Sequence, residues 1–341
     1  MKPLRCGLIG YGAWGSHHAR VISANRRARL VAIAARTETT RSRAQAEHPG
    51  CEIYADYREL LLRDDIDAVV VVLPSHLHAE VGLAVLDSNR HMLLEKPMCL
   101  TVNDCEIMTD LARVRNRVLA IGHEMRQSSL WGKVKELIAA GAIGDPRYAL
   151  IELWRKPYRL GADGWRYDIE RVGNWILEEP IHFFDLARWY LEGIAKPESV
   201  YARAASSRTD RPELQDFFSA TLNFSGGRYA VISQSLGGWE HHQVVKVSGT
   251  DGALWASWSG AMDRTFEPAF SLRLRRGDAI EDVPLARAAG EVFELETQFA
   301  QFVHAVQEGA PLAATGDDGC WAVRLCLKAQ ESVQRGVPMP F

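Results

Sequence analysis

The N-terminal segment Leu4–Gly15 reads LRCGLIGYGAWG, an apolar run that ends in a glycine-rich turn. Apolar runs of this length without polar alternation are typical of strands buried on both faces of a parallel sheet. The turn places Gly10, Gly12 and Gly15 in the pattern G-x-G-x-x-G, and a helical pattern, Trp14–Ala24, follows at once. In this setting the glycines allow a tight turn, close backbone approach to a pyrophosphate, and close packing of helix on strand. The stretch therefore predicts a dinucleotide-binding βαβ unit.

The same alternation of short apolar runs and amphipathic segments continues to about residue 125. We expect further strands at Leu30–Ala34, Ala68–Leu73, His91–Leu94 and Val118–Ile121, and further helices at Thr39–Glu47, Asp56–Leu62, His76–Ser88 and Thr101–Arg115. Strands and helices at this spacing indicate right-handed βαβ units and a doubly wound parallel sheet. Residues 1–125 are therefore predicted to form an α/β domain with a Rossmann fold that binds NAD(P).

The pattern changes in the remaining chain, 126–341. Helices are expected at Leu130–Ala140, Ile181–Tyr190, Glu291–Gln307 and Asp318–Gln334, and strands at Tyr148–Trp154, Ser199–Ala204, Phe217–Phe224, Tyr229–Ser235, Gln243–Ser248 and Gly252–Ser257. Consecutive strands joined by tight turns indicate an antiparallel or mixed sheet. We expect an α+β domain with a mostly antiparallel open sheet for substrate binding and oligomerisation, and we expect helix 318–334 to pack back on the first domain.

Composition excludes several classes of function. Of the 341 residues, 47% are hydrophobic and 24% charged, and the formal net charge of −3 gives no reason to expect nucleic acid or an anionic membrane as a partner. The longest apolar stretches, such as Ala68–Pro74, are far shorter than the roughly 18 residues of a membrane span. The chain begins almost directly with a predicted strand, so we expect no signal peptide.

Cysteines and histidines give no sign of disulfides or metal. The six cysteines are Cys6, Cys51, Cys99, Cys105, Cys320 and Cys326, and they contain no C-x-x-C pair. We interpret them as reduced residues of a cytoplasmic protein. His241 and His242 are adjacent, but no other residue completes a metal site at suitable spacing, so no metal is predicted.

The end of the second predicted strand bears on the choice of cofactor. An acidic side chain there binds the ribose hydroxyls of NAD, but this strand ends in Ala35 and Arg36, with Arg41 and Arg43 close behind. Arginine suits the 2′-phosphate of NADP, which it binds through paired charge-assisted hydrogen bonds. We therefore expect NADP to be preferred over NAD. The alternative is that these arginines form a solvated helix face.

Two other strands end at the carboxyl edge of the predicted sheet, where open α/β folds bind ligands. Pro74 and His78 follow one strand, and Glu95-Lys96-Pro97 follows the next. A lysine at this edge is expected to lie half buried against the cofactor. The complete set of expected cofactor-binding residues is Gly10, Gly12, Ala13, Trp14, Gly15, Arg36, Pro74, His78, Glu95 and Lys96.

Four motifs together resemble the glucose–fructose oxidoreductase / inositol dehydrogenase / MocA (Gfo/Idh/MocA) family. They are the glycine pattern, Glu95-Lys96-Pro97 at the expected distance, Gly122-His123 with Arg126, and the segment Gly173–Asp185, which reads GNWILEEPIHFFD. That segment resembles the family's D-x-G-x-H-x-x-D stretch, and the similarity covers essentially the whole chain. The resemblance implies that Lys96 and His182 are catalytic and flank the carbon that gives or takes a hydride. His182 would be the general acid–base for the substrate oxygen, and Lys96 a proton partner or electrostatic helper.

The resemblance also implies substrate-binding roles for Glu178, Asp185 and Arg126. The sequence departs from the family pattern at two positions: Glu178 stands where the family usually has aspartate, and Pro180 where it has glycine. The carboxylate is kept but is one methylene longer, so no particular family substrate can be carried over. Proline is well placed in the first turn of the helix Ile181–Tyr190.

Trp165 and Arg166 belong to a segment rich in aromatic and arginine side chains, and we expect both to bind substrate. Flat rings beside polar groups suit sugars and cyclitols, whereas arginines suit a carboxylate or a phosphate. Such residues are also common in protein interfaces. Our leading hypothesis is an NAD(P)-dependent dehydrogenase that acts on a CH–OH group of a sugar, cyclitol or related polyol.

Two alternatives remain open at this point. One is an enzyme that reduces a non-sugar carbonyl or imine, or cleaves a glycoside with a tightly held cofactor. The other is a non-catalytic NADP(H)-sensing regulator, for which Lys96 and His182 would be superfluous. The resemblance further implies a homodimer or homotetramer formed through the C-terminal sheet, where Trp239, Trp255 and Trp258 would need a cover.

Overall fold

A computed structural model of the protein describes residues 2–341. The chain forms two compact units. The first comprises the residues up to His123 together with Leu295–Cys320, and the second comprises Glu124–Glu294 together with Trp321–Phe341. The first unit therefore includes a segment that is distant in sequence from the rest of it.

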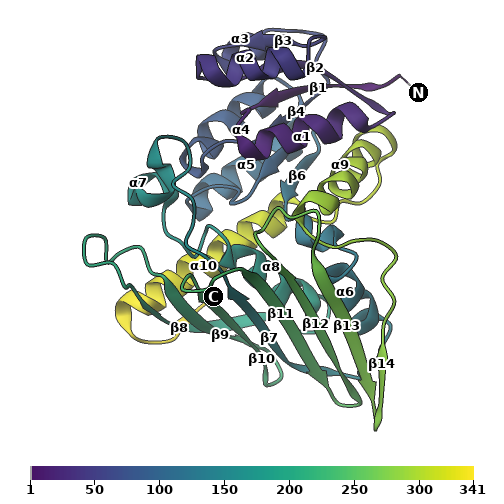
Figure 1. Ribbon diagram of the computed structural model, residues 1–341, viewed down its shortest axis with the longest axis vertical. Helices are drawn as coiled ribbons and strands as arrows, with labels where there is room; N and C mark the ends of the chain where they lie inside the picture. Colours follow the sequence, from purple (N-terminus) through teal and green to yellow (C-terminus); the bar gives the residue numbers. More distant parts are fainter. Residues whose placement is uncertain (1) are drawn as a thin grey trace. The chain divides into compact units, whose positions relative to one another are not determined.

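The first unit contains a six-stranded parallel sheet in the order β3-β2-β1-β4-β5-β6 (Figure 1). The strands are β1 (Leu4–Ile9), β2 (Ala28–Ala34), β3 (Glu52–Tyr54), β4 (Ala68–Val71), β5 (His91–Glu95) and β6 (Leu119–Gly122), and the helices between them are α1 (Ala13–Ala24), α2 (Glu38–Glu47), α3 (Tyr57–Leu61), α4 (His78–Asp87) and α5 (Val102–Val114). This strand order is that of dinucleotide-binding Rossmann domains. The predicted doubly wound sheet is confirmed. The sequence pattern missed only the three-residue strand β3.

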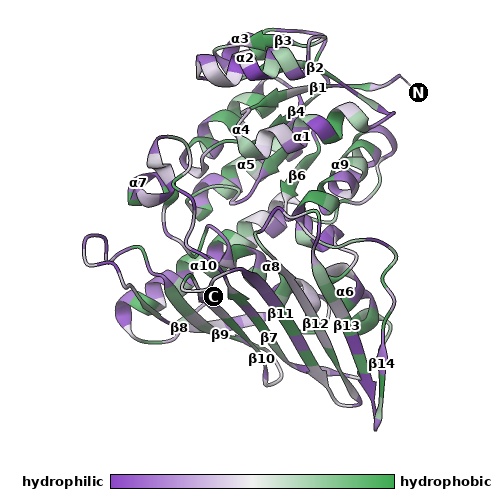
Figure 2. Cartoon of the chain, viewed as in Figure 1, coloured by the Kyte–Doolittle hydropathy of each residue, from purple (hydrophilic) through white to green (hydrophobic). Residues whose placement is uncertain are grey.

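The core of the first unit explains why its strands lack polar alternation. All four residues of β4, AVVV, are buried, and the strand is uniformly hydrophobic (Figure 2). Leu8 of β1 and Leu93 of β5 belong to the same apolar cluster, which also contains Leu295, Phe299, Phe302 and Val303 of α9 (Glu291–Glu308). Strands covered on both faces must be apolar throughout. The distant segment Leu295–Cys320 thus contributes to the core of the cofactor-binding fold.

The second unit contains a nine-stranded sheet in the order β14-β13-β12-β11-β7-β10-β9-β8-β15. The strands are β7 (Pro146–Trp154), β8 (Pro197–Ala205), β9 (Phe217–Phe224), β10 (Arg228–Ser235), β11 (His241–Gly249), β12 (Gly252–Gly260), β13 (Ala269–Arg276), β14 (Ala279–Asp282) and β15 (Met339–Pro340). Its helical segments are η2 (Glu124–Gln127), α6 (Trp131–Ala139), η3 (Ala162–Tyr167), α7 (Ile169–Val172), α8 (Pro180–Tyr190) and the larger part of α10 (Gly316–Arg335), from Trp321 onward. Neighbouring strands are antiparallel except β7 and β10, which are parallel. The predicted mostly antiparallel sheet is confirmed, although β13, β14 and β15 were not expected.

Side chains alternate between the two faces of this sheet. Helices α6 and α8 contact its strands, and Leu254 and Ala256 of β12 are buried. Trp255, between them, is 53% exposed. The expectation that Trp258 also needs a cover is wrong: it is 3% exposed, and its indole N–H donates to the carbonyl oxygen of Ala289 at 2.8 Å. Residues three apart in a strand lie on opposite faces, so Trp255 and Trp258 cannot share one.

No helix within residues 2–341 combines the length and the hydropathy needed to cross a membrane. In the same part of the chain, no group of three or more His, Cys, Asp and Glu side chains is arranged to hold a metal ion.

Candidate active site

The glycine turn after β1 is open where a phosphate group would lie. Gly10 has φ of +100°, and a Cβ atom there would lie 2.0 Å from the carbonyl oxygen of Val72. A Cβ atom on Gly15 would lie 2.1 Å from the carbonyl oxygen of Gly10, whereas one on Gly12 would meet no atom within 4 Å. Helix α1 begins here, with Gly12 as its N-cap and no side chain capping it. Its first N–H groups therefore suit a dinucleotide pyrophosphate.

The end of β2 carries arginine side chains and no carboxylate. Ala35 is buried, and Arg36, the next residue, is exposed. Arg41 donates to the carbonyl oxygens of Ala35 and Arg36, at 3.2 and 2.6 Å, and Arg43 donates to the carbonyl oxygen of Gly12 at 3.2 Å. Arg41 and Arg43 therefore brace the strand end and the glycine turn. Arg36 itself is exposed just after the end of β2, where the sequence predicts a 2′-phosphate contact.

Lys96 directly follows β5 and is half-buried. The Lys96–Pro97 peptide bond is cis. The side chain of His78 holds this segment: its Nδ1 lies 2.6 Å from the carbonyl oxygen of Pro97, and its Nε2 lies 2.9 Å from that of Leu73. His78 is fully buried, and burial lowers its pKa against the opposing effect of these two carbonyl groups. It joins the ends of β4 and β5, next to the residue expected to be catalytic.

Glu95 is buried, and both of its carboxylate oxygens accept hydrogen bonds. Its Oε1 lies 2.9 Å from the indole nitrogen of Trp14 and 2.8 Å from Nε2 of His18, and its Oε2 accepts the backbone N–H of Lys96 at 3.2 Å. Burial by itself raises the pKa of Glu95, but the hydrogen bonds from His18 and Trp14, together with nearby positive charge, outweigh it and lower the pKa. The carboxylate therefore remains ionised inside the protein.

In the second unit, His182 lies in the first turn of α8, where Pro180 provides the helix start that the sequence predicts. His182 is 3% exposed, and its Nε2 lies 3.6 Å from Oε1 of Glu124, which is 2% exposed. A buried carboxylate at this distance can orient an imidazole and stabilise its protonated form. The sequence pattern did not single out Glu124. The feature of the sequence that could have identified Glu124 is its position two residues after the end of β6, next to the Gly122-His123 motif.

Arg126 and Asp185 form a buried ion pair in the same unit. The guanidinium group donates from Nε to Oδ2 at 2.8 Å and from Nη2 to Oδ1 at 2.6 Å, and both side chains are at most 2% exposed. The ring of Trp189 lies 5.4 Å from the guanidinium carbon. Both residues were expected to bind substrate, and the structure brings them together as partners of each other.

Glu178 and Glu179, which precede α8, each contact an arginine. Glu178 accepts a hydrogen bond from Nε of Arg166, and Glu179 accepts one from Nη1 of Arg155. The guanidinium of Arg166 lies over the ring of Trp165, 4.8 Å from its centre. The structure therefore brings together three of the expected substrate-binding residues, Glu178, Trp165 and Arg166.

The ion pair of Glu179 extends into a larger network, in which Asp263 and His241 are largely buried and Arg159 is exposed. Oδ2 of Asp263 lies 3.4 Å from Nη2 of Arg155, and its Oδ1 lies 3.4 Å from Nη2 of Arg159. Nε2 of His241 lies 3.4 Å from Oε1 of Glu179. Burial lowers the pKa of His241 to about 4, against the raising effect of Glu179, so this imidazole is neutral near pH 7. No sequence pattern indicates this network, because its members come from separate strands and loops.

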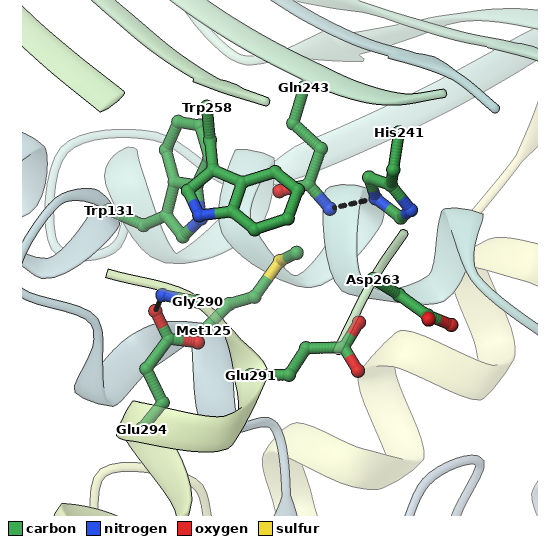
Figure 3. A pocket seen from close by; sticks show the side chains of 9 residues that line it. All are labelled: Met125, Trp131, His241, Gln243, Trp258, Asp263, Gly290, Glu291 and Glu294. Carbon is green, nitrogen blue, oxygen red and sulfur yellow. Dashed lines mark hydrogen bonds between the residues drawn. The ribbon is translucent and has the colours of Figure 1, made fainter. Parts of the chain in front are cut away.

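A cavity of about 200 Å³, partly open to solvent, lies beside this network in the second unit (Figure 3). Its lining consists of Met125, Trp131, His241, Gln243, Trp258, Asp263, Gly290, Glu291 and Glu294. The side-chain amide of Gln243 and Nε2 of His241 are 2.9 Å apart, and Glu294 accepts the backbone N–H of Gly290 at 3.0 Å. Burial raises the pKa of Glu294 to about 7. None of the residues predicted to bind substrate lines this cavity.

Comparisons with known proteins agree with this fold. Residues 4–123 match the family described as "Oxidoreductase family, NAD-binding Rossmann fold", and residues 131–255 match the "GFO/IDH/MocA C-terminal domain". The chain is 32% identical to dTDP-3,4-didehydro-2,6-dideoxy-alpha-D-glucose 3-reductase of Streptomyces violaceoruber, over 82% of this chain and 79% of that protein. It is 29% identical to inositol 2-dehydrogenase of Rhizobium meliloti, over 97% of each chain.

Solved structures show the same architecture. Aldose-aldose oxidoreductase from Caulobacter crescentus, complexed with glycerol, superposes with a TM-score of 0.86 at 21% identity and covers 100% of both chains. GenD2 from gentamicin A biosynthesis, in complex with NAD, superposes with a TM-score of 0.83 at 22% identity and covers 100% of this chain and 97% of that one. At these identities the likeness shows that the fold is shared.

Proposed function

Because the chain belongs to the Gfo/Idh/MocA family of NAD-binding oxidoreductases, we propose that it transfers a hydride between NAD(P) and a carbinol or carbonyl carbon of an uncharged polyol, a sugar or a cyclitol. The relatives named above act on a nucleotide-linked sugar and on inositol. The observation that carries the proposal for this chain is that four arginines near α8 are paired with carboxylates of the protein.

Each of these arginines already has a carboxylate partner. Arg126 pairs with Asp185 and Arg166 with Glu178. The network of Arg155 and Arg159 contains Glu179 and Asp263. The four guanidinium groups are thus matched by four carboxylates.

To bind Arg126, Arg155 or Arg166, whose side chains are 1, 11 and 23% exposed, an anionic substrate would have to displace a carboxylate, which leaves a buried charge unpaired at a cost of several kcal/mol. Hydroxyl groups need no such displacement, because a paired carboxylate or guanidinium keeps spare hydrogen-bonding positions for them. The paired arginines therefore favour a polyol over a sugar phosphate or a sugar acid. The sequence left open a sugar or cyclitol on one side and a substrate with a carboxylate or a phosphate on the other. We propose the sugar or cyclitol.

The catalytic roles follow the family resemblance, residue by residue. When bound, the nicotinamide ring accepts or donates the hydride. We assign to His182 the proton transfer to and from the substrate oxygen, and to Glu124, at 3.6 Å, the orientation of its imidazole and the stabilisation of the charge that forms there. We assign to Lys96 the role of proton partner or electrostatic helper that the resemblance implies. Asp185, whose carboxylate is held by Arg126, keeps α8 in place.

We propose NADP as the preferred cofactor. The support is the exposed Arg36 at the tip of β2, together with the lack of a carboxylate on the two residues that end this strand. Arg41 and Arg43 hold the surrounding backbone and so fix the surface on which the 2′-phosphate would rest. The guanidinium group of Arg36 would bind that phosphate with paired, charge-assisted hydrogen bonds.

We also propose that a second copy of the chain covers the open face of the sheet, giving a homodimer or homotetramer. Trp154 of β7, Tyr229 of β10 and Trp255 of β12 are 45, 42 and 53% exposed on that face. Large exposed aromatic side chains on one face of a sheet favour a partner that covers that face. Trp255→Glu should lower the molar mass measured by light scattering, whereas Leu62→Glu, which changes an exposed leucine of the first unit, should not. A wild-type protein that is monomeric at micromolar concentration would end this part of the proposal.

The main experiment is a substrate panel monitored at the absorbance of the reduced nicotinamide. Inositol isomers and aldoses are compared with matched anionic analogues, such as glucose against glucuronate and glucose 6-phosphate, with NADP and with NAD. We expect turnover with at least one neutral polyol and a kcat/KM at least 10-fold lower for its charged analogues. A preference for the charged member of a pair would contradict the proposed substrate class. No NAD(P)-linked turnover with any polyol would contradict the proposed reaction.

A further inference from the structure

Glu95 contacts two functional segments of the first unit at once. Its Oε1 lies within hydrogen-bond distance of Trp14 and His18 on α1, at 2.9 and 2.8 Å. Its Oε2 accepts the backbone N–H of Lys96 at 3.2 Å. Helix α1 is the helix whose N-terminus faces the dinucleotide site, and Lys96 is the proposed catalytic lysine. One carboxylate therefore joins the cofactor-binding helix to the lysine.

The surroundings of Glu95 are built to hold this carboxylate in one position. Trp14 and His18 are one helical turn apart, so their side chains project from the same face of α1, and their ring centres are 5.8 Å apart in an edge-on arrangement. Gly122 of β6 is paired in register with Glu95. A Cβ atom on Gly122 would lie 2.9 Å from Oε2 of Glu95, so a larger residue there would push the carboxylate away.

The burial of the pair makes these hydrogen bonds strong. Glu95 is 5% exposed and His18 is 1% exposed. In such surroundings a hydrogen bond to a carboxylate is worth more than in water, and an unpaired carboxylate is costly. The three bonds engage both oxygens of the carboxylate and so fix its orientation.

We propose that Glu95 is a positioning residue that couples helix α1 to Lys96. The inference rests on the proposed function, because it assumes that Lys96 acts on the reacting centre. When a dinucleotide fixes the N-terminus of α1, the donors on Trp14 and His18 fix the carboxylate, and its other oxygen fixes the backbone of Lys96. The orientation of the lysine then depends on the helix that binds the phosphates.

A double-mutant cycle between Glu95→Gln and Lys96→Met tests this coupling. The glutamine has the same size but only one accepting oxygen, so at least one of the three hydrogen bonds is lost. We expect Glu95→Gln to lower kcat at least 10-fold when Lys96 is present and less than about 2-fold in the Lys96→Met background. A purely structural role would give the same loss in both backgrounds, and that result would overturn the proposal.

The same cycle is also measured on the dissociation constant of NADPH, by quenching of tryptophan fluorescence, which requires no turnover. We expect Glu95→Gln to weaken binding several-fold with Lys96 and less than about 2-fold in the Lys96→Met background. Equal weakening in both would again overturn the coupling. A wild-type protein that turns over no polyol would refute the proposed function, and this binding cycle would still decide the present inference.

Two further variants guard against a folding defect. If Glu95→Gln does not unfold cooperatively, Trp14→Phe removes one N–H donor, keeps a ring at a half-buried position, and should show a smaller loss with the same dependence on Lys96. Glu47→Gln is the matched control, because Glu47 accepts a hydrogen bond from Tyr11 in the same glycine turn without contacting Lys96. It should change both measurements less than 2-fold. A Lys96-dependent loss in Glu47→Gln would show that the coupling is not specific to Glu95.

Discussion

Replacing Asp185 with asparagine is expected to leave the buried guanidinium of Arg126 without its counter-charge. The two side chains are joined by hydrogen bonds of 2.8 and 2.6 Å and are at most 2% exposed, so water cannot replace the lost carboxylate. Breaking a buried pair of this kind costs about 3–5 kcal/mol. For a unit of this size that corresponds to a fall in melting temperature of roughly 6–20 °C. Urea unfolding followed by circular dichroism measures the loss directly.

Two comparisons make the result interpretable. Asp282→Asn breaks the 2.8 Å pair of Asp282 with Arg273, whose side chains are 79 and 55% exposed, and should cost less than about 1 kcal/mol. The double variant Arg126→Met with Asp185→Leu removes both buried charges and should recover most of the lost stability. If Asp185→Asn costs no more than Asp282→Asn, the pair does not hold α8, and a direct substrate-binding role for Asp185 returns.

The remaining predictions concern catalysis, cofactor choice and pH. His182→Asn should lower kcat at least 100-fold with unchanged circular dichroism, and Glu124→Gln about 10-fold; activity within 3-fold of wild type in either would contradict its assigned role. Arg36→Ala should raise KM for NADPH about 10-fold and leave KM for NADH unchanged, and equal effects on both would refute the 2′-phosphate contact. Burial raises the pKa of Glu294 from 4.5 to about 7, so its carboxyl stays protonated in the folded state while the unfolded chain ionises. Stability therefore falls as pH rises from about 4.5 to 7, by roughly 3 kcal/mol in all, and Glu294→Gln should remove that part of the pH dependence in urea titrations at pH 5 and 8.

Several parts of the candidate site were accessible from local sequence. The glycine turn, Lys96 after β5 and the proline that begins α8 each depend on a few consecutive residues whose backbone requirements are read directly. Glu124 could have been found by the rule already applied to Lys96, because it follows a strand of the same sheet edge. The opposite orientations of Trp255 and Trp258 also follow from the two-residue period of a strand.

The partners of the charged residues were beyond the reach of the sequence. Arg166, Glu178 and Asp185 were expected to meet substrate, but the structure shows that each has a charged partner within the protein. Those pairings depend on which segments become neighbours. Glu179, Arg155 and His241 meet because β7 lies between β10 and β11, with a parallel partner on one side and an antiparallel partner on the other.

The amino-acid sequence by itself determined most of the strands and helices, the parallel cofactor-binding sheet and the glycine turn that suits a dinucleotide. These features depend on backbone conformation and on burial that repeats every two residues in a strand and every three to four residues in a helix. Both are properties of short segments. Only the tertiary structure decided which carboxylate neutralises which arginine, and that Glu95 joins α1 to Lys96. Electrostatic pairing depends on distances between residues far apart in the chain, and those distances exist only once the sheet order is formed.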